Sequence, residues 1–395
     1  MLKSFTIKNF QSFKEQAHVS FEQGKLSSND FQSFETPFGS KLSKAVAVIG
    51  PNASGKTTLI KSLAFLTWFF KDSFHQLKIE DLIPVAPHFS NTKEPREFEI
   101  EFICQNGEWK YKLVLDEKRV YSEALYKKQT RSYSYVFTRD WNPNTQSYIV
   151  KQQHFGMQQR EAEKVRENAS LISTAAQYEV PIAVEFRKIP FFTNTHVLGR
   201  QHMDDGQIYG AANFYAQNES FRVQMATLLK NWDLGLTDVR IEKQARSLEN
   251  GETNEVYVPY GIHAVGKKEV KLILKLESSG TQGAYLLLSR ILPALESGGL
   301  VAIDELEADL HPHMLTPLLD LFFSPKTNPK NAQIIFTCHS MEVLSLLHKS
   351  QVVLVEKNAE CMSDAWRLDS VKGVRNDDNL YAKYMAGAYG AIPQL

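Results

Sequence analysis

Residues 50–57 read Gly-Pro-Asn-Ala-Ser-Gly-Lys-Thr and fit the pattern GxxxxGK[ST], which constrains the fold more than any other segment of this chain. An apolar stretch at residues 44–49 precedes the loop, as expected of a strand covered on both faces, and a helix is expected from Lys56 to about Phe70. In such a strand–loop–helix unit, successive backbone N–H groups and the amino end of the helix point at phosphate oxygens. The pattern therefore predicts an α/β fold that holds a nucleotide at this loop.

The side chains of this loop have separate expected tasks. Lys56 should reach the β and γ phosphates, and the Thr57 hydroxyl should bind Mg²⁺. The alternative is a glycine-containing turn with an incidental lysine, which the position between a buried strand and a helix disfavours. The expected nucleotide-binding residues are Gly50, Pro51, Asn52, Ala53, Ser54, Gly55, Lys56, Thr57 and Thr58.

Two later apolar strands also end in polar groups. Residues 299–303 lead directly to Asp304 and Glu305, and residues 333–338 lead to His339. In open α/β sheets the carboxyl ends of the strands meet the ligand. We expect Asp304 to hold Mg²⁺ through water and Glu305 to orient and deprotonate an attacking water. His339 comes at the end of the next strand and is therefore placed to contact the γ-phosphate.

A Ser-Gly turn opens another expected helix. Residues 277–283 read Glu-Ser-Ser-Gly-Thr-Gln-Gly and precede an apolar stretch from Ala284 to Leu295. A turn of this kind at a helix amino terminus is an anion site, with Ser279, Gly280 and Gln282 as its expected binding residues. A plain helix cap by Ser279 is the alternative, and both interpretations can hold at once.

Composition excludes several other classes of protein. Lys+Arg and Asp+Glu both number 45, so a protein that coats nucleic acid along its whole surface is disfavoured. The apolar run Leu63 to Phe70 is far shorter than the ~20 residues that cross a bilayer, and the amino end lacks the apolar core of a signal peptide. The three cysteines are widely spaced, which makes a disulfide framework or a zinc site unlikely. We expect a cytoplasmic protein without a membrane partner.

The length of 395 residues exceeds one hydrophobic core of ordinary size. Residues 1–139 should form the amino-terminal half of a nucleotide-binding head with an antiparallel β subdomain, in which Asn106-Gly107 signals a hairpin. Residues 140–270 should form an inserted, mainly helical lobe that meets a partner through basic residues. Residues 271–395 should complete the head. The basic residues expected to act in that lobe include Arg160, Lys164, Arg166, Arg187 and Lys188.

These motifs, in this order, resemble ABC-type ATPases of the SMC, RecF and OLD group, and most closely the stand-alone bacterial AAA15 (RloA-like) proteins. The opening Phe5 to Phe13 is similar to the "I-x-N-F-x-S-F" start of SMC-like heads. The run Asp304 to Pro312 resembles the "D-E-x-x-x-x-L-H-P" of OLD and AAA15 proteins. The tail from Arg375 to Pro393 is similar to AAA15 carboxyl ends.

The resemblance implies a P-loop ABC-type head with a RecA-like parallel sheet, ATP and Mg²⁺ as ligands, and a homodimer or higher even oligomer. In such dimers the signature turn of one subunit caps the nucleotide of the other, and Thr281 in place of the usual glycine would restrict that approach. A Mg²⁺-sensing glutamine is also implied. Gln177 is the candidate, in preference to Gln105 in the expected hairpin turn.

The resemblance implies a role in phage defence or abortive infection. The protein would sense a DNA or phage-derived trigger and control a separately encoded effector, a TOPRIM (RloB-like) or HNH nuclease. OLD proteins carry their own nuclease after the ATPase, whereas only 56 residues follow His339 here. The alternative is a DNA-repair ATPase of the RecF or SMC type, although a sustained coiled coil is lacking. A transporter subunit is disfavoured by the Phe5–Phe13 opening and the Leu310-His311-Pro312 run.

Overall fold

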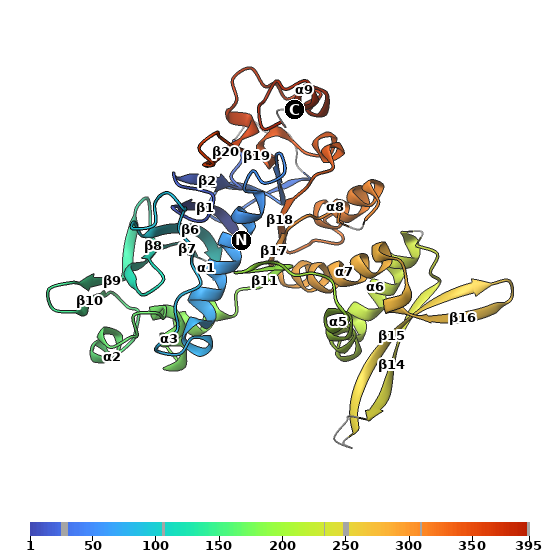
Figure 1. The fold of residues 1–395 in the computed structure, drawn as a ribbon, viewed down its shortest axis with the longest axis horizontal. Helices are drawn as coiled ribbons and strands as arrows, with labels where there is room; N and C mark the ends of the chain where they lie inside the picture. Colours follow the sequence, from blue (N-terminus) through green and yellow to red (C-terminus); the bar gives the residue numbers. More distant parts are fainter. Residues whose placement is uncertain (25–30, 105–106, 233, 248–252, 309, 393–395) are drawn as a thin grey trace.

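The computed structural model describes residues 1–24, 31–104, 107–232, 234–247, 253–308 and 310–392 (Figure 1). Gln105, Asn106 and Pro393, which take part in the expected hairpin turn and tail, lie outside these residues. Within the described part of the chain, no helix is long and apolar enough to cross a bilayer.

A six-stranded sheet forms the centre of the molecule. All its neighbouring strands run parallel except the pair of β19 and β20, which is antiparallel. Its side chains alternate between two cores: Val46 and Val48 of β5 face one side, whereas Ala45, Ala47 and Ile49 face the other. In spatial order the strands are β11 (Phe191–Thr193), β17 (Leu300–Ile303), β18 (Gln333–Thr337), β5 (Ala45–Ile49), β19 (Val352–Lys357) and β20 (Ser363–Arg367).

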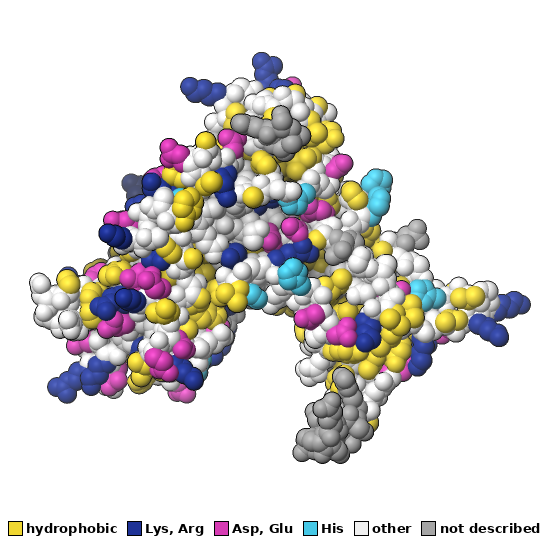
Figure 2. Space-filling view, in the orientation of Figure 1, with side chains coloured by type: hydrophobic (Ala, Val, Ile, Leu, Met, Phe, Trp, Pro, Cys, Tyr) yellow, Lys and Arg dark blue, Asp and Glu magenta, His cyan; other side chains and the backbone are white. Residues whose placement is uncertain are grey.

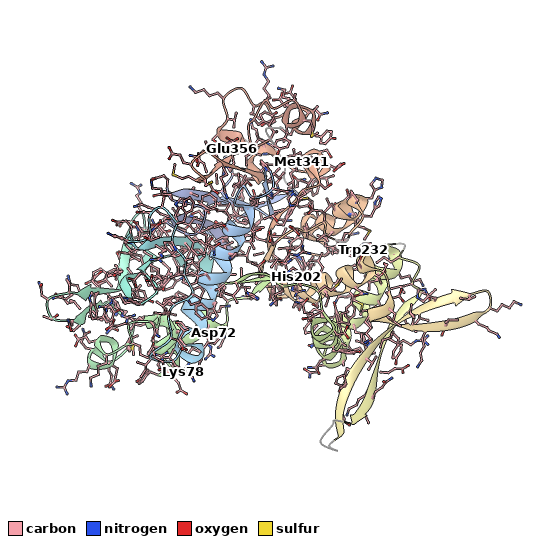
Figure 3. All side chains as sticks on the ribbon, in the orientation of Figure 1. Asp72, Lys78, His202, Trp232, Met341 and Glu356 are labelled. Atoms are coloured by element: carbon pink, nitrogen blue, oxygen red, sulfur yellow. The ribbon has the colours of Figure 1, made fainter. Side chains whose placement is uncertain are left out.

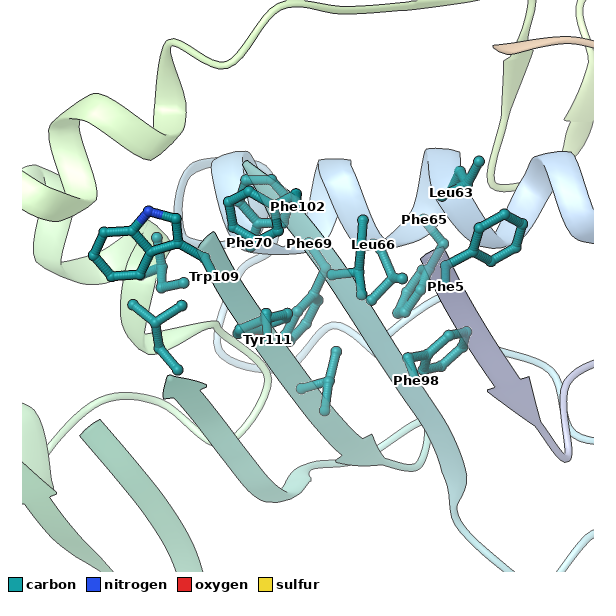
Figure 4. Packing of buried hydrophobic residues seen from close by; sticks show 14 of the residues in the cluster. Phe5, Leu63, Phe65, Leu66, Phe69, Phe70, Phe98, Phe102, Trp109 and Tyr111 are labelled. Atoms are coloured by element: carbon teal, nitrogen blue, oxygen red, sulfur yellow. The ribbon is translucent and has the colours of Figure 1, made fainter. Parts of the chain in front are cut away.

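Helix α1 (Lys56–Gln76) lies between this sheet and a second, antiparallel sheet. Figure 4 shows aromatic side chains of α1, such as Phe65 and Phe69, over Phe98 and Tyr111 of the second sheet. Because these rings are fully or nearly fully buried, the amino end of α1 is held rigidly. The strands of the second sheet, in spatial order, are β10 (Ser147–Gln152), β9 (Tyr133–Asn142), β8 (Val120–Lys128), β7 (Gly107–Leu115), β6 (Arg96–Cys104), β1 (Leu2–Lys8) and β2 (Ala17–Ser20).

Three short helices extend this amino-terminal unit: α2 (Gln159–Glu163), α3 (Leu171–Gln177) and α4 (Pro181–Arg187). A fully buried ion pair, Arg139–Glu123, joins them to the sheet, since Arg139 also donates to the carbonyls of Val165, Arg166 and Ala169. The boundary expected at residue 140 therefore falls inside β9, and residues 140–190 pack with the residues before them rather than in a separate lobe.

Basic residues expected to serve the lobe contact this same unit. Arg166 donates to the carbonyl of Phe74 at 2.8 Å, and Arg187 lies 3.7 Å from Asp72, both on α1. Lys188, which follows α4, pairs locally with Glu185 of that helix. The contacts of Arg166 and Arg187 attach the segment to α1.

The lobe begins after β11 and contains both helices and strands. Figure 1 shows it as the limb opposite the antiparallel sheet, with β14, β15 and β16 projecting from it, and Figure 2 shows a hollow between the two limbs. Helix α7 runs from the lobe back to the central sheet, which it covers on the face opposite α1. The elements are β12 (Thr195–His196), β13 (Gly199–Arg200), α5 (Asp205–Gln217), α6 (Glu219–Asn231), β14 (Asp238–Ser247), β15 (Thr253–Val265), β16 (Lys268–Ile273) and α7 (Ser279–Ser297).

The carboxyl-terminal segment closes the head. Helices α8 (Leu315–Phe323) and α9 (Leu380–Met385) belong to the same core as α7. The tail is fixed by Tyr384, whose hydroxyl donates to the carbonyl of Ala391 at 2.5 Å, and by Glu356, whose carboxylate accepts from the Ala391 N–H. The two-stranded pair β3 (Ser33–Glu35) and β4 (Lys41–Ser43) completes the amino-terminal part.

Candidate functional site

The loop between β5 and α1 requires glycine at two positions. A Cβ at Gly50 would lie 2.0 Å from the carbonyl oxygen of Val355 on the neighbouring strand. Gly55 has φ +114, and a Cβ there would approach the hydroxyls of Ser363 and Ser12 within 2.6 and 2.7 Å. Close packing and left-handed backbone therefore both fix glycine in this loop.

The lysine of the loop is buried and faces the loop's own carbonyls. Lys56 Nζ donates to the carbonyl oxygens of Gly50 and Pro51, each at 2.8 Å. Burial lowers the pKa of Lys56, and the charge of Asp304 opposes that shift. The Lys56 ammonium group thus lies against the carbonyl groups of the loop.

Asp304 lies at the end of β17 directly against the loop. Its Oδ1 accepts hydrogen bonds from Thr57 at 3.1 Å and from Thr337 at 2.7 Å. Thr337, the last residue of β18, is fully buried and also accepts the backbone N–H of Glu305 at 2.6 Å. Three separate segments of the sequence therefore meet at one carboxylate oxygen.

Glu305 follows in an unusual backbone conformation, with φ +53. A residue with a side chain costs free energy in this left-handed region, so its surroundings must hold it there. Glu305 Oε2 accepts from Arg200, and Oε1 lies 3.8 Å from His339 Nε2. The side chain is 38% exposed, which leaves it accessible to water.

Asn194, one residue beyond β11, fixes the backbone of the same turn. Its amide nitrogen donates to the carbonyl of Asp304 and its amide oxygen accepts from the N–H of Asp304, both at 2.8 Å. No sequence pattern marks Asn194 as part of the site, because a lone asparagine between short strands carries no local signal.

One open pocket of about 660 Å³ is lined by residues 52–58 of the predicted phosphate loop and by Asp304, Glu305 and His339, while Gly50 and Pro51 are not part of its lining. Thr337 lines it too, as do Ser12 and Lys357, which the sequence analysis did not assign to the site. Ser12 and Thr337 lie in segments that the sequence patterns already single out through neighbouring residues, whereas no local sequence pattern marks Lys357. The lining residues are Ser12, Asn52, Ala53, Ser54, Gly55, Lys56, Thr57, Thr58, Asp304, Glu305, Thr337, His339 and Lys357.

The signature turn lies at the amino end of α7. Ser278, not Ser279, caps the helix, since its Oγ accepts the N–H of Thr281 at 3.2 Å. Ser279 is left exposed, while Gln282 donates to the carbonyl of Glu277 at 2.7 Å. Within the described residues, the lining of the phosphate-loop pocket includes none of residues 277–283.

The structure does not bring Gln177 to the pocket. Its helix α3 contacts the far end of α1, where Ser173 Oγ accepts the N–H of Phe74 and donates to the carbonyl of Lys71. That end lies roughly 25 Å along the helix from Lys56 at 1.5 Å per residue. The prediction that Gln177 senses Mg²⁺ in this pocket is therefore not retained.

Comparison with known families decides the classification. The family described as "AAA domain, putative AbiEii toxin, Type IV TA system" matches residues 45–345, about three quarters of the chain. The chain belongs to this AAA-domain family. Among solved structures, the SMC head domain from Thermotoga maritima is similar, at 16% identity and a TM-score of 0.42 over 93% of this chain and 98% of that chain. No curated protein sequence matches significantly.

The predicted α/β P-loop architecture is confirmed for this AAA-domain protein, whereas the prediction of a mainly helical lobe is wrong, since the lobe holds the sheet of β14, β15 and β16 beside its helices. The site also fits Mg²⁺ and a nucleotide phosphate chain. A buried lysine lies beneath a glycine loop, and the buried Ser54 Oγ finds no hydrogen-bond partner among the described residues. Thr57 and Asp304 supply the hard oxygen ligands that Mg²⁺ prefers.

Proposed function

We propose that this AAA-domain protein binds Mg²⁺–ATP at the phosphate loop and hydrolyses it. The observation that carries the proposal is the meeting of Thr57, Asp304 and Thr337 at one carboxylate oxygen, beside Lys56 and Glu305. A polar cluster of this kind, at the carboxyl ends of parallel strands and the amino end of a helix, is suited to polyphosphate chemistry.

Each side chain has a separate role in this proposal. Lys56 neutralises the β and γ phosphates, and Thr57 and Asp304 hold the cation. Mg²⁺ held there would supply positive charge that offsets the charge developing on the phosphates. Glu305 accepts a proton from the attacking water, and the exposed His339 contacts the γ-phosphate. Asn52, Ala53, Gly55 and Thr58 contribute backbone and shape around the phosphates.

We further propose that ATP binding joins two copies of the chain. Ser279, Gly280 and Gln282 then cap the nucleotide held by the partner copy. The absence of residues 277–283 from the described pocket lining supports this arrangement, because one face of the γ-phosphate would otherwise stay open. Two heads related by a two-fold axis complete both pockets with a single self-complementary contact.

We propose that this ATPase controls a separately encoded effector, a TOPRIM (RloB-like) or HNH nuclease, in an anti-phage system. The family description, with its AbiEii toxin and type IV toxin–antitoxin system, supports a role in abortive infection. A DNA or phage-derived trigger would act through the lobe. ATPase stimulation by DNA alone would instead favour a repair ATPase.

The first experiment tests hydrolysis with Glu305→Gln. This change removes the base and leaves the cation ligands, so ATP binding should persist while the rate falls on the order of 10²- to 10⁴-fold. An ATP-locked dimer should accumulate, visible as a doubled mass by light scattering. Hydrolysis at the wild-type rate would exclude Glu305 as the base.

The second experiment tests completion of the site in trans. Ser279→Arg and Lys56→Ala should each be inactive alone, the first through bulk at the partner's γ-phosphate and the second through lost nucleotide binding. A mixed dimer contains one pocket built from two intact halves, so mixing should restore part of the activity. If subunits exchange and no mixture recovers activity, either each chain completes its own site or both pockets must act together.

A further inference from the structure

The lobe is joined to the site by a short hairpin. Strand β11 pairs in parallel with β17, which carries Asp304 and Glu305 at its end, and β12 and β13 follow before α5 begins at Asp205. The backbone N–H of Gln201 donates to the carbonyl of Asn194 at 2.8 Å and closes the hairpin. Figure 3 shows His202 near the centre of the molecule, where the chain passes from the head to the lobe.

Arg200, the last residue of β13, pairs with Glu305 across this junction. The arginine is 31% exposed and the glutamate 38%. Since Glu305 Oε1 is turned toward His339, both carboxylate oxygens face cationic or potentially cationic side chains. In this arrangement the ion pair with Arg200 holds the carboxylate that would accept a proton from the attacking water.

Arg290 of α7 holds the same hairpin from the other side. Its Nε donates to the carbonyl of Thr193 at 3.0 Å, and Nη2 lies 3.4 Å from the side-chain oxygen of Gln201. Arg290 lies three turns along the helix that begins at Ser279. A continuous set of contacts therefore runs from the signature helix through the hairpin to Glu305.

We propose that Arg200 is a positioning residue that restrains Glu305, and that Arg290 sets the place of Arg200. The helix that carries the signature turn thereby controls when the base is free. This inference rests on the proposed role of Glu305 in hydrolysis.

The restraint has a simple physical basis. A guanidinium–carboxylate pair is a charge-assisted hydrogen bond, so the contact with Arg200 holds Oε2 of Glu305 in place. Docking of the signature turn on a partner's nucleotide shifts α7, and the shift reaches the hairpin through Arg290. Arg200 then releases Glu305, so hydrolysis proceeds only after the dimer has formed.

The test measures single-turnover hydrolysis at saturating protein, so that product release does not mask the chemical step. Arg200→Ala should raise the rate about fivefold, which at tenfold per 1.36 kcal/mol corresponds to about 1 kcal/mol. In a separate steady-state titration, the ATP concentration that gives half the maximal rate should stay within twofold of the wild-type value. Arg200→Lys retains the pairing charge and should hydrolyse at the wild-type rate.

Arg222→Ala is the matched control, because Arg222 pairs with Glu219 on α6 and is 29% exposed, close to the value for Arg200. It should not change the rate. Arg290→Met should also accelerate hydrolysis, yet add nothing in the Arg200→Ala background, since both act on one restraint. If Arg290→Met fails to fold, Gln201→Met removes the acceptor of the same contact without altering α7.

The outcomes separate the two proposals. A fall or no change in rate for Arg200→Ala, with Glu305→Gln inactive, overturns the restraint alone. Independent, multiplicative accelerations by Arg200→Ala and Arg290→Met overturn the relay. Wild-type hydrolysis by Glu305→Gln overturns the proposed function itself, whatever Arg200 does.

Discussion

Thr337→Val perturbs the site through a side chain that the pocket needs for shape as well as hydrogen bonding. Valine keeps nearly the volume of threonine but removes the hydroxyl. Thr337 is fully buried, so water cannot replace what is lost. The change deletes the 2.7 Å bond to Asp304 and the 2.6 Å acceptor for the N–H of Glu305. Thr57 remains as the other side-chain donor to Asp304 Oδ1.

The magnitude follows from the kind of bond removed. A hydrogen bond to a charged group contributes about 1.5–3 kcal/mol, and an unpaired buried N–H costs a similar amount. If the loss of these hydrogen bonds displaces Asp304 and Glu305, kcat/KM for ATP should drop on the order of 10- to 100-fold. Nucleotide binding without Mg²⁺ should change little, because Lys56 and the loop are untouched.

Steady-state hydrolysis across a range of Mg²⁺ concentrations provides the assay, with Thr174→Val as the control. Thr174 is also buried and its hydroxyl donates to the carbonyl of Ser170 at 2.8 Å, but it lies on α3. The control should keep wild-type kcat/KM. A Thr337→Val enzyme within twofold of wild type would refute the argument that this hydroxyl positions the two acids.

Three further predictions concern other parts of the chain. Arg139→Met leaves a buried carboxylate unpaired and should cost about 3–5 kcal/mol of stability, measured as a lower urea midpoint. Hydrogen bonding to Glu277 raises the pKa of His263 above 6.5. The contact therefore stabilises the fold below pH 6.5, and this stabilisation is lost as the pH rises through the raised pKa. An NMR titration should show a lower pKa of His263 in Glu277→Gln. Gly55→Ala should abolish nucleotide binding in calorimetry through its two close contacts, whereas Gly39→Ala, also at positive φ but with open space around it, should not.

The phosphate loop was predictable because its determinants are local. A buried strand, two glycines and a helix amino terminus occupy consecutive positions, and the physics of anion binding acts within them. Asp304 and His339 were found for a related reason, since apolar strands in a parallel sheet end at the same edge. The expected positions of these residues in one pocket agree with its lining.

Arg200, Asn194 and Gln177 illustrate the limit of local patterns. Arg200 and Asn194 act through partners more than 100 residues away, and nothing adjacent to them in sequence indicates a site. Gln177 was predicted to sense Mg²⁺ because it lies between two motifs in the sequence. That position does not determine which end of α1 its helix contacts. In the structure, α3 packs at Lys71 and Phe74, far from the phosphate loop.

The boundary at residue 140 was misplaced for a different reason. Basic residues such as Arg166 and Arg187 favoured a separate, partner-binding lobe that begins at residue 140, but both of these side chains contact α1. The strands β9 and β10 continue the antiparallel sheet beyond the expected boundary. A hairpin joins its sheet by hydrogen bonds that composition does not reveal.

The phosphate loop is held from both ends of the sequence, which bears on how the head can move. Ser363 of β20 donates through its hydroxyl to the carbonyl of Ser54 at 2.5 Å, and its N–H donates to the carbonyl of Ser12 at 2.8 Å. Gly55 fits between the two serine hydroxyls. Because the turn at Ser12, strand β20 and the loop are tied together here, the loop side of the site is held firmly. The side chain of Glu305 is tied instead to Arg200 of a short hairpin, which Arg290 of α7 contacts, so the control over hydrolysis that we propose enters from the lobe.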